Sequence, residues 1–193
     1  MTVAPVTLEG HGVRLEPIEE RHREGLRAAA DDPAVWEFTP VDGRGGPLRA
    51  WLDVWLDRAI ASGDLVLAVR RLEDDALVGS TRFLNVEPAH RRLEIGGTWY
   101  GADARGTTVN AACKLILLTQ AFEVLDALRV ELKCDARNVR SRRAIARLGA
   151  TEEGVLRRHM ILGDGWVRDT VYFSVLEDEW PRVRAGLEAR VRR

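Results

Sequence analysis

The order of helices and strands along this 193-residue chain predicts a mixed-sheet α/β layer fold. A helical beginning is followed by three segments with the period of strands, which predicts an antiparallel meander. Strands then alternate with helices, which favours further strands in the same sheet with helices on its faces. Because 46% of the residues are hydrophobic, the chain can bury a real core, and we expect one domain over 1–193.

Apolar spacing divides the first hundred residues into helices and strands. Helices are expected over 19–30 and 47–62. The glycine-rich run 42–46 before Pro47 predicts a loop that could act as a substrate flap. Strands are expected over 13–16, 65–72, 77–85 and 92–100.

The second half of the chain continues with alternating periods. Helices are expected over 107–125, 138–148 and about 179–192. Gly149 follows the second of these helices in the position of a C-terminal cap. Strands are expected over 129–135, 153–161 and 166–176.

Composition excludes several classes of protein. With 29 basic and 30 acidic residues the net charge is −1, so we expect no nucleic-acid partner and no binding to anionic membranes. No run of eighteen apolar residues or signal pattern occurs, and we expect a cytoplasmic protein. Cys113 and Cys134 lack the spacing of metal ligands, so buried thiols and no metal are expected.

The helix over 107–125 is apolar nearly all round, which predicts a central, buried helix. Its polar residues at the start, Thr107, Asn110 and Lys114, are spaced three and four apart and share one side. A helix start has unpaired N–H groups and a partial positive charge, so this one could bind a phosphate. Alternatively, Thr107 or Thr108 only caps the helix and Lys114 reaches solvent.

The start of the next helix carries a second group of polar residues. Ser141 shares a face with Ile145 and Leu148, so it should point toward the sheet. An anionic ligand could lie along the basic ridge on the adjacent face, formed by Arg140, Arg143 and Arg147. The alternatives are a helix cap at Asn138 and a solvated arginine face.

Several short motifs occur in an order that resembles the general N-acetyltransferase (GNAT) superfamily, and within it the RimJ/RimL-like branch of ribosomal-protein N-terminal acetyltransferases. The resemblance covers about 13–176. The motifs are Val13-Arg14-Leu15, Glu94-Ile95-Gly96, Arg105-Gly106, Arg129-Val130-Glu131-Leu132, Asn138-x-x-Ser141, Leu148-Gly149-Ala150 and Glu153-Gly154-Val155-Leu156-Arg157.

This resemblance implies a mostly antiparallel sheet of six or seven strands, splayed between strands four and five and flanked by helices. It also implies transfer of an acetyl group from acetyl-CoA to a primary amine. The implied cofactor-binding residues are Thr98, Trp99 and Tyr100 for the pantetheine and, for the pyrophosphate, the helix start Arg105, Gly106, Thr107, Thr108, Val109, Asn110 and Lys114. Asn138 would contact the pantetheine or orient nearby water, and Arg143 is a further implied cofactor-binding residue. Thr108 and Asn110 depart from the family signature, which has small residues at both positions.

The resemblance also implies catalytic roles. Ser141 would donate a proton to the leaving thiolate. Glu94 would act as a base through water, although a structural cross-strand role is an alternative, and Glu153 and Asp169 are further candidates. Without a strong base an α-amine is favoured, because deprotonating it at pH 7 costs about 1 kcal/mol, against roughly 4–5 kcal/mol for lysine.

Other interpretations remain open. The acceptor could be a protein or peptide N-terminus or a small amine such as a polyamine, an amino acid or an aminoglycoside. A non-catalytic acyl-CoA-binding module is a third hypothesis. Trp36, Trp51 and Trp55 could line the acceptor side or belong to the core. A homodimer could form through a strand edge or the C-terminal helix.

Overall fold

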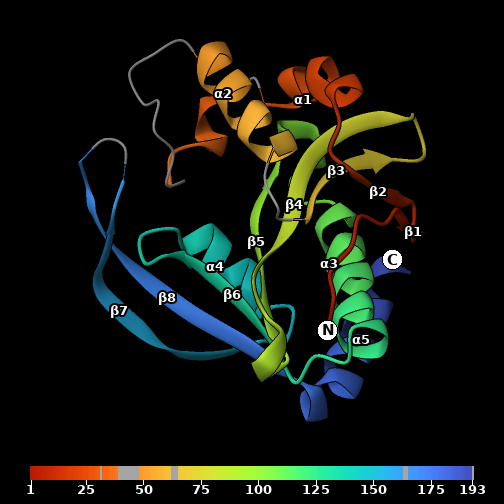
Figure 1. Cartoon of the computed structure of the whole chain (residues 1–193), viewed down its shortest axis with the longest axis vertical. Coiled ribbons are helices and arrows are strands. Elements are labelled where there is room, and N and C mark those ends of the chain that lie inside the picture. The colour runs from red at the N-terminus through yellow and green to blue at the C-terminus, as the bar shows by residue number, and fades with distance from the viewer. Residues whose placement is uncertain (31, 39–47, 62–64, 163–164, 193) are drawn as a thin grey trace.

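The computed structural model describes the chain except for residues 31, 39–47, 62–64, 163–164 and 193, and at 33 and 48–52 it describes the backbone alone. The loop expected over 42–46 therefore lies outside the described residues. Figure 1 shows the whole arrangement, with the strands running through the middle and helices on both sides.

In the described part of the chain, eight strands form one sheet in the order β1-β2-β3-β4-β5-β6-β8-β7. Neighbouring strands are antiparallel except β5 and β6, which are parallel. The bounds are β1 Leu8–Gly10, β2 Val13–Pro17, β3 Leu65–Arg71, β4 Ala76–Glu87, β5 Arg92–Tyr100, β6 Arg129–Asp135, β7 Thr151–Ile161 and β8 Val167–Leu176. The mixed, mostly antiparallel sheet is confirmed, with one strand more than the expected six or seven.

The additional strand is β1, which forms a hairpin with β2. Two residues connect the strands, and both have left-handed backbone angles, with φ of 51° at His11 and 79° at Gly12. Such a two-residue turn matches the right-handed twist of the strands it joins. Three residues are too few to show an alternating pattern, so the hairpin is defined by its turn.

The helices occupy both faces of the sheet. Their bounds are α1 Arg23–Ala29, α2 Leu48–Ala61, α3 Val109–Thr119, α4 Val139–Ala146 and α5 Trp180–Val191. A 3₁₀ turn over Glu20–His22 precedes α1, and a π-helical turn over Gln120–Val124 continues α3. Among the described residues, no helix is both long enough and apolar enough to cross a bilayer.

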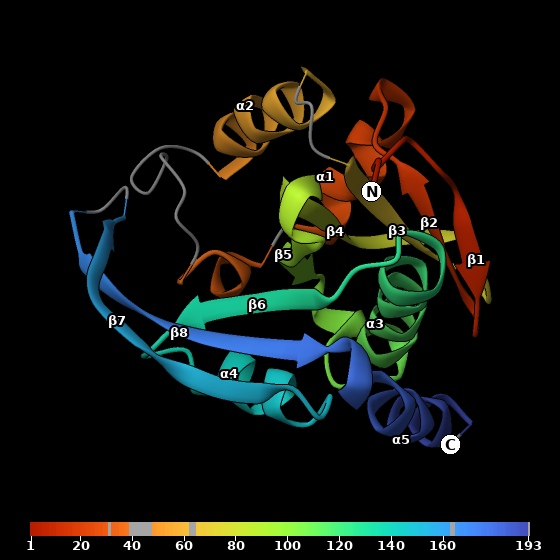
Figure 2. The same ribbon diagram turned by 60° about the horizontal axis from the view of Figure 1, so that its bottom comes forward.

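Two apolar clusters hold these layers together. The larger cluster packs α3 and α5 against one face of the sheet, with Leu117, Phe173 and Leu187 among its buried members. Helices α1 and α2 lie on the opposite face of the sheet (Figure 2), and the smaller cluster is buried beneath them. In it, the Trp99 ring centroid lies 5.1 Å from that of Trp36 and 6.0 Å from that of Trp55. Trp36 and Trp55 therefore belong to the core. The side chain of Trp51 lies outside the described part of the chain.

Candidate active site

Strands β5 and β6 stay together for a short distance and then separate. Their parallel pairing joins Arg92 to Arg129, Leu93 to Val130 and Glu94 to Glu131. Both strands continue, β5 to Tyr100 and β6 to Asp135, without further pairing to each other among the described residues. The expected splay between the fourth and fifth strands of the family fold is present. It leaves the backbone of β5 open along its C-terminal half.

A β-bulge lies on β5 within the splayed segment. Ser80 of β4 pairs with Trp99 and Arg82 pairs with Gly96, so β5 has one residue more than β4 between these pairs. Gly97 has φ of 56°, which favours glycine, and a Cβ there would come within 2.7 Å of the Arg82 Nε. The bulge turns Thr98 toward α3. The Gly96-Gly97 pair was the sequence signal for it.

Lys114 lies inside the protein and not at the helix start. Its side chain is only 4% exposed, and its Nζ donates to the Thr98 Oγ1 at 2.7 Å and to the Thr81 Oγ1 at 3.4 Å. Burial lowers the pKa of Lys114 to about 8. The alternative in which Lys114 reaches solvent is wrong. Its charge is also directed toward β4 and β5, away from the mouth formed by Thr107 and Asn110.

The entrance to α3 contains one residue with an unusual backbone. Gly106 has φ of 82°, in the left-handed region. Thr108 is the N-terminal cap residue with φ of −73° and ψ of −14°, an ordinary right-handed conformation. A β-branched residue is therefore unstrained at Thr108, and the departure from the family signature has no backbone cost there.

Some N–H groups at the start of α3 are available to a ligand. The Thr107 Oγ1 donates to the Ala104 carbonyl at 2.8 Å and accepts the Val109 N–H at 3.3 Å, so Thr107 contributes to capping. Among the described residues, no acceptor is found for the N–H groups of Asn110 and Ala111. These two donors and the partial positive charge of the helix start suit an anion.

The entrance of α3 and the start of α4 converge on one carboxylate. Arg105 forms an ion pair with Asp32, and this contact is the main cause that lowers the pKa of Asp32. The charge of Arg140 on α4 also acts on Asp32. Arg140 and Arg143 are exposed, as expected for a solvated ridge. Asp32 is thus in direct contact with Arg105 and within range of the charge of Arg140.

Ser141 points toward the sheet from the first turn of α4. The Asn138 Oδ1 accepts the Ser141 N–H at 2.9 Å, so Asn138 caps the helix. Ser141 also lies near enough to the thiol of Cys134 on β6 to act on the pKa of that thiol. Ile145 and Leu148 are buried on the same face, which confirms the inward orientation. Cys134 is a buried free thiol whose pKa is raised by burial, and Cys113 is also buried and free, as expected.

Glu94 is held in a buried network. Glu94 is only 6% exposed. Its Oε2 lies 2.7 Å from the Lys133 Nζ and accepts a hydrogen bond from the Asn85 Nδ2 at 2.7 Å. Lys133 also lies 4.5 Å above the Tyr172 ring. These contacts favour the structural cross-strand interpretation of Glu94, because an ion-paired carboxylate is a weaker base.

The two reserve carboxylates are also engaged. Glu153 accepts the Arg129 Nη1 at 2.6 Å and the Ser174 Oγ at 2.8 Å, and the hydrogen bond from Arg129 is the main cause that lowers its pKa to about 2. The Asp169 Oδ1 accepts the Arg158 N–H at 2.7 Å. These contacts favour structural roles for both carboxylates.

Sequence reasoning missed a group of charged residues on β6 and β8. Asp135 is buried and forms an ion pair with Arg137, whose guanidinium lies 4.1 Å from the Trp166 ring and 5.5 Å from the Phe38 ring. Arg168 is buried beside them. The available signal was the alternation of charged and apolar residues in each strand, which places the charged set on one face.

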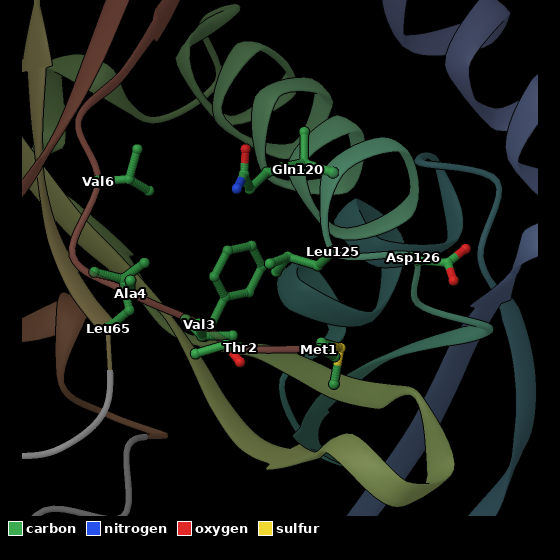
Figure 3. A pocket seen from close by; sticks show the side chains of 11 residues that line it. Met1, Thr2, Val3, Ala4, Val6, Leu65, Gln120, Leu125 and Asp126 are labelled. Carbon is green, nitrogen blue, oxygen red and sulfur yellow. The ribbon is translucent and has the colours of Figure 1, made fainter.

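A pocket of about 440 Å³ lies elsewhere, where the N-terminal segment meets the end of α3. Figure 3 shows Val3, Val6, Leu65, Gln120 and Leu125 on its walls. None of the residues predicted to bind cofactor or to act in catalysis lines it. Among the described residues, no cluster of three His, Cys, Asp or Glu side chains is placed to hold a metal ion.

Comparison with known proteins identifies relatives of this chain. YdaF of Bacillus subtilis (strain 168), whose name provisionally assigns it as a ribosomal N-acetyltransferase, is 36% identical over 110 residues. The match covers 56% of this chain and 58% of YdaF, so it spans just over half of that curated relative.

Solved structures show the same fold over nearly the whole chain. A GCN5-related N-acetyltransferase from Brucella melitensis is 30% identical with a TM-score of 0.87, and the match covers 98% of this chain and 86% of that one. Mycobacterium smegmatis RimJ, solved in complex with CoA-disulfide, is 23% identical with a TM-score of 0.79 and coverage of 96% and 94%.

The family comparison covers most of the chain. The sequence model described as the acetyltransferase (GNAT) domain matches residues 13–151. This range contains the splayed strands, the entrance of α3 and Ser141. The chain therefore belongs to the GNAT acetyltransferase family.

Proposed function

We propose that this protein transfers the acetyl group of acetyl-CoA to the α-amine of a protein N-terminus by direct attack. The observation that carries the proposal is the splay of β5 from β6 after Glu94 and Glu131, next to an inward-facing Ser141. Membership of the GNAT family supports acetyl transfer. The name of YdaF, which assigns it provisionally as a ribosomal N-acetyltransferase, supports a ribosomal protein as the acceptor.

The chain offers suitable groups for both ends of acetyl-CoA. The N–H groups of Asn110 and Ala111, which have no acceptor in the described part of the chain, suit its pyrophosphate. The open backbone of β5 around the bulge at Gly97 suits its pantetheine, because an extended amide chain can add to an exposed strand edge. When bound, the cofactor supplies the activated acetyl group as a thioester.

Ser141 is proposed as the proton donor to the departing thiolate. Its hydroxyl lies on the sheet-facing side of α4, and the cap at Asn138 holds its backbone. A positioned acid contributes about 10²–10⁴-fold, whereas alignment of two bound reactants can contribute about 7–11 kcal/mol. Most of the acceleration is therefore assigned to binding both substrates in the splay.

The carboxylates near the splay favour an acceptor that needs little help to lose its proton. Glu94, Glu153 and Asp169 each have partners. An α-amine with a pKa of about 7.7–8.0 is partly neutral at pH 7, whereas a lysine near 10.4 is almost fully charged. This difference supports a protein or peptide N-terminus over a lysine side chain.

Two measurements test the proposal in sequence. Acetyl-CoA at a hundredfold excess over its Kd should stabilise the protein by about 2.7 kcal/mol in thermal unfolding. Release of free CoA should then be followed with N-terminal peptides, polyamines, aminoglycosides and amino acids as acceptors. Peptides with a free α-amine should react fastest, and blocked peptides with one lysine should react slowly.

The outcomes separate the remaining hypotheses. Faster turnover of a polyamine or aminoglycoside than of every peptide would show that the acceptor is a small amine and not a protein N-terminus. Stabilisation by acetyl-CoA without turnover of any amine would favour a non-catalytic binding module. No stabilisation by acetyl-CoA or CoA would refute the proposal.

A further inference from the structure

The side chains of β6 and β8 form a polar face on one side of the sheet. Register pairs Glu131 with Ser174, Lys133 with Tyr172 and Asp135 with Thr170. The polar face is defined by these residues and Arg168, the next residue of β8 on the same side: Glu131, Lys133, Asp135, Arg168, Thr170, Tyr172 and Ser174. Polar groups buried on such a face require partners.

The carboxylates on and beside this face all have cationic partners. Glu94 pairs with Lys133, and Asp135 pairs with Arg137 at 2.8 Å. Glu131 lies 3.1 Å from the Arg129 Nε. Each of these carboxylates is therefore already paired with a cation other than Arg168.

Arg168 is the exception among the cations. It is only 7% exposed, yet no hydrogen-bond acceptor for its Nε and no ion pair of its guanidinium are found in the part of the chain that is described. Burial lowers the pKa of Arg168, although the guanidinium remains protonated. An unpaired buried charge is costly, so a missing anionic partner is the expected explanation.

The position of Arg168 associates it with the proposed chemistry. The groups whose charges act on it are Asp135 and Cys134 of β6, Glu94 of β5 and Tyr172 of β8. Cys134 is also the residue whose pKa Ser141 affects. The guanidinium therefore lies on the face of β6 and β8 opposite to Cys134 and Ser141, where the charge of Glu94 beside the splay also acts on it.

We propose that Arg168 binds a carboxylate of the acceptor, so that the preferred acceptor is an amine with an acidic group in its first or second residue. This inference rests on the proposed function and specifies its substrate class. A carboxylate and a guanidinium form two parallel hydrogen bonds, which fixes the acceptor in direction as well as position. The bound acceptor thereby supplies the partner that Arg168 does not have among the described residues.

The pyrophosphate of acetyl-CoA is a less suitable partner for Arg168. The donors that suit it are the N–H groups of Asn110 and Ala111 at the start of α3. Arg168 instead extends from β8, on the face that carries Lys133 and Asp135. A guanidinium beside the acceptor would also lower the pKa of a bound amine and so favour its neutral form.

The test uses pairs of amidated peptides that differ in one group. Ser-Glu-Ala-Ala amide and Ser-Gln-Ala-Ala amide are compared as acceptors by CoA release, with the wild type, Arg168→Gln, Arg168→Lys and the control Arg58→Gln from the exposed side of α2. The wild type and the control should prefer the acidic peptide at least about tenfold in kcat/KM. Arg168→Gln should abolish this preference, and Arg168→Lys should retain part of it.

A binding measurement tests recognition of the same peptide carboxylate without requiring turnover. Isothermal titration calorimetry measures binding of the two N-acetylated product peptides to the wild type. The acidic product should bind at least about tenfold more tightly than the amide product. Serine and serinamide, compared in the same way, show whether a free α-carboxylate serves as well as an acidic side chain.

Each outcome decides the inference. Equal binding and equal kcat/KM of acidic and amide ligands with the wild type would refute it. An unchanged preference in a folded Arg168→Gln variant, or a change confined to the KM of acetyl-CoA, would also refute it. Preferential binding of acidic ligands without any turnover would support the role of Arg168 and refute the proposed reaction.

Discussion

Replacing Lys114 by methionine should stabilise the protein at neutral pH. The ammonium group is buried and has two threonine hydroxyls as partners, with no carboxylate among its described contacts. Methionine is similar in length and has no charge to desolvate. The Thr98 and Thr81 hydroxyls bond each other at 2.8 Å, so both keep a partner when the ammonium is removed.

The magnitude follows from the pKa. Lys114 has a pKa of about 8 in the folded protein, compared with 10.5 for an ordinary lysine. Since one pKa unit corresponds to about 1.4 kcal/mol, keeping this lysine charged costs the fold about 3 kcal/mol at pH 7. Two hydrogen bonds lost in the variant offset part of this gain.

The lowered pKa of Lys114 determines how the stability of the protein changes with pH. Below pH 8 both states hold the proton, and the full penalty applies. Between pH 8 and 10.5 the folded state releases it first, so the penalty decreases as pH rises. The advantage of Lys114→Met over the wild type should therefore fall by about 2 kcal/mol between about pH 7 and about pH 9.5.

Urea unfolding of both proteins at the two pH values measures this difference. Tyr100 and Cys113 have raised pKa values because of burial and weaken the fold at alkaline pH, but they are present in both proteins. Lys133→Met is the matched control, because Lys133 has an ion-pair partner in Glu94 and its loss should destabilise. A Lys114→Met effect that is the same at both pH values would refute the reasoning.

Three further substitutions test other parts of the structure. Glu94→Gln should cost about 1–3 kcal/mol of unfolding free energy because it removes the closer of the two carboxylates that pair with the half-buried Lys133, whereas loss of turnover at unchanged stability would indicate a base. Gly79→Ala should cost about 3 kcal/mol or more in thermal unfolding, because the new Cβ would overlap the Trp99 carbonyl oxygen, and a cost below about 1 kcal/mol would contradict this. Ser141→Ala should lower kcat by about 10²-fold or more with unchanged KM for acetyl-CoA, and full turnover would remove its proposed role.

The fold could be predicted largely because its strong periodic signals agree with one another. The strand expected over 129–135 has those limits in the structure, and the helix expected over 47–62 is Leu48–Ala61. The spacing of apolar residues could not predict elements that are defined by their backbone hydrogen bonds alone. The hairpin of β1 and the π-helical turn over Gln120–Val124 are both of this kind.

The candidate site was predicted less completely, for a different reason. Ser141 and Asn138 were placed correctly because α4 has a clear apolar face. Helix α3 is apolar nearly all round, so spacing could not show that Lys114 faces the sheet. Arg168 is far in sequence from Asp135 and Glu94, and only the strand order brings them together.

The short parallel contact between β5 and β6 has a mechanical consequence. Three residue pairs join two leaves of the sheet in the described chain, β1 to β5 on one side and β6 to β8 on the other. Such a narrow joint can change its angle while breaking few hydrogen bonds. A molecule bound between the two leaves contacts both of them and restricts their relative motion. Binding in the gap and the stiffness of the whole sheet are therefore linked.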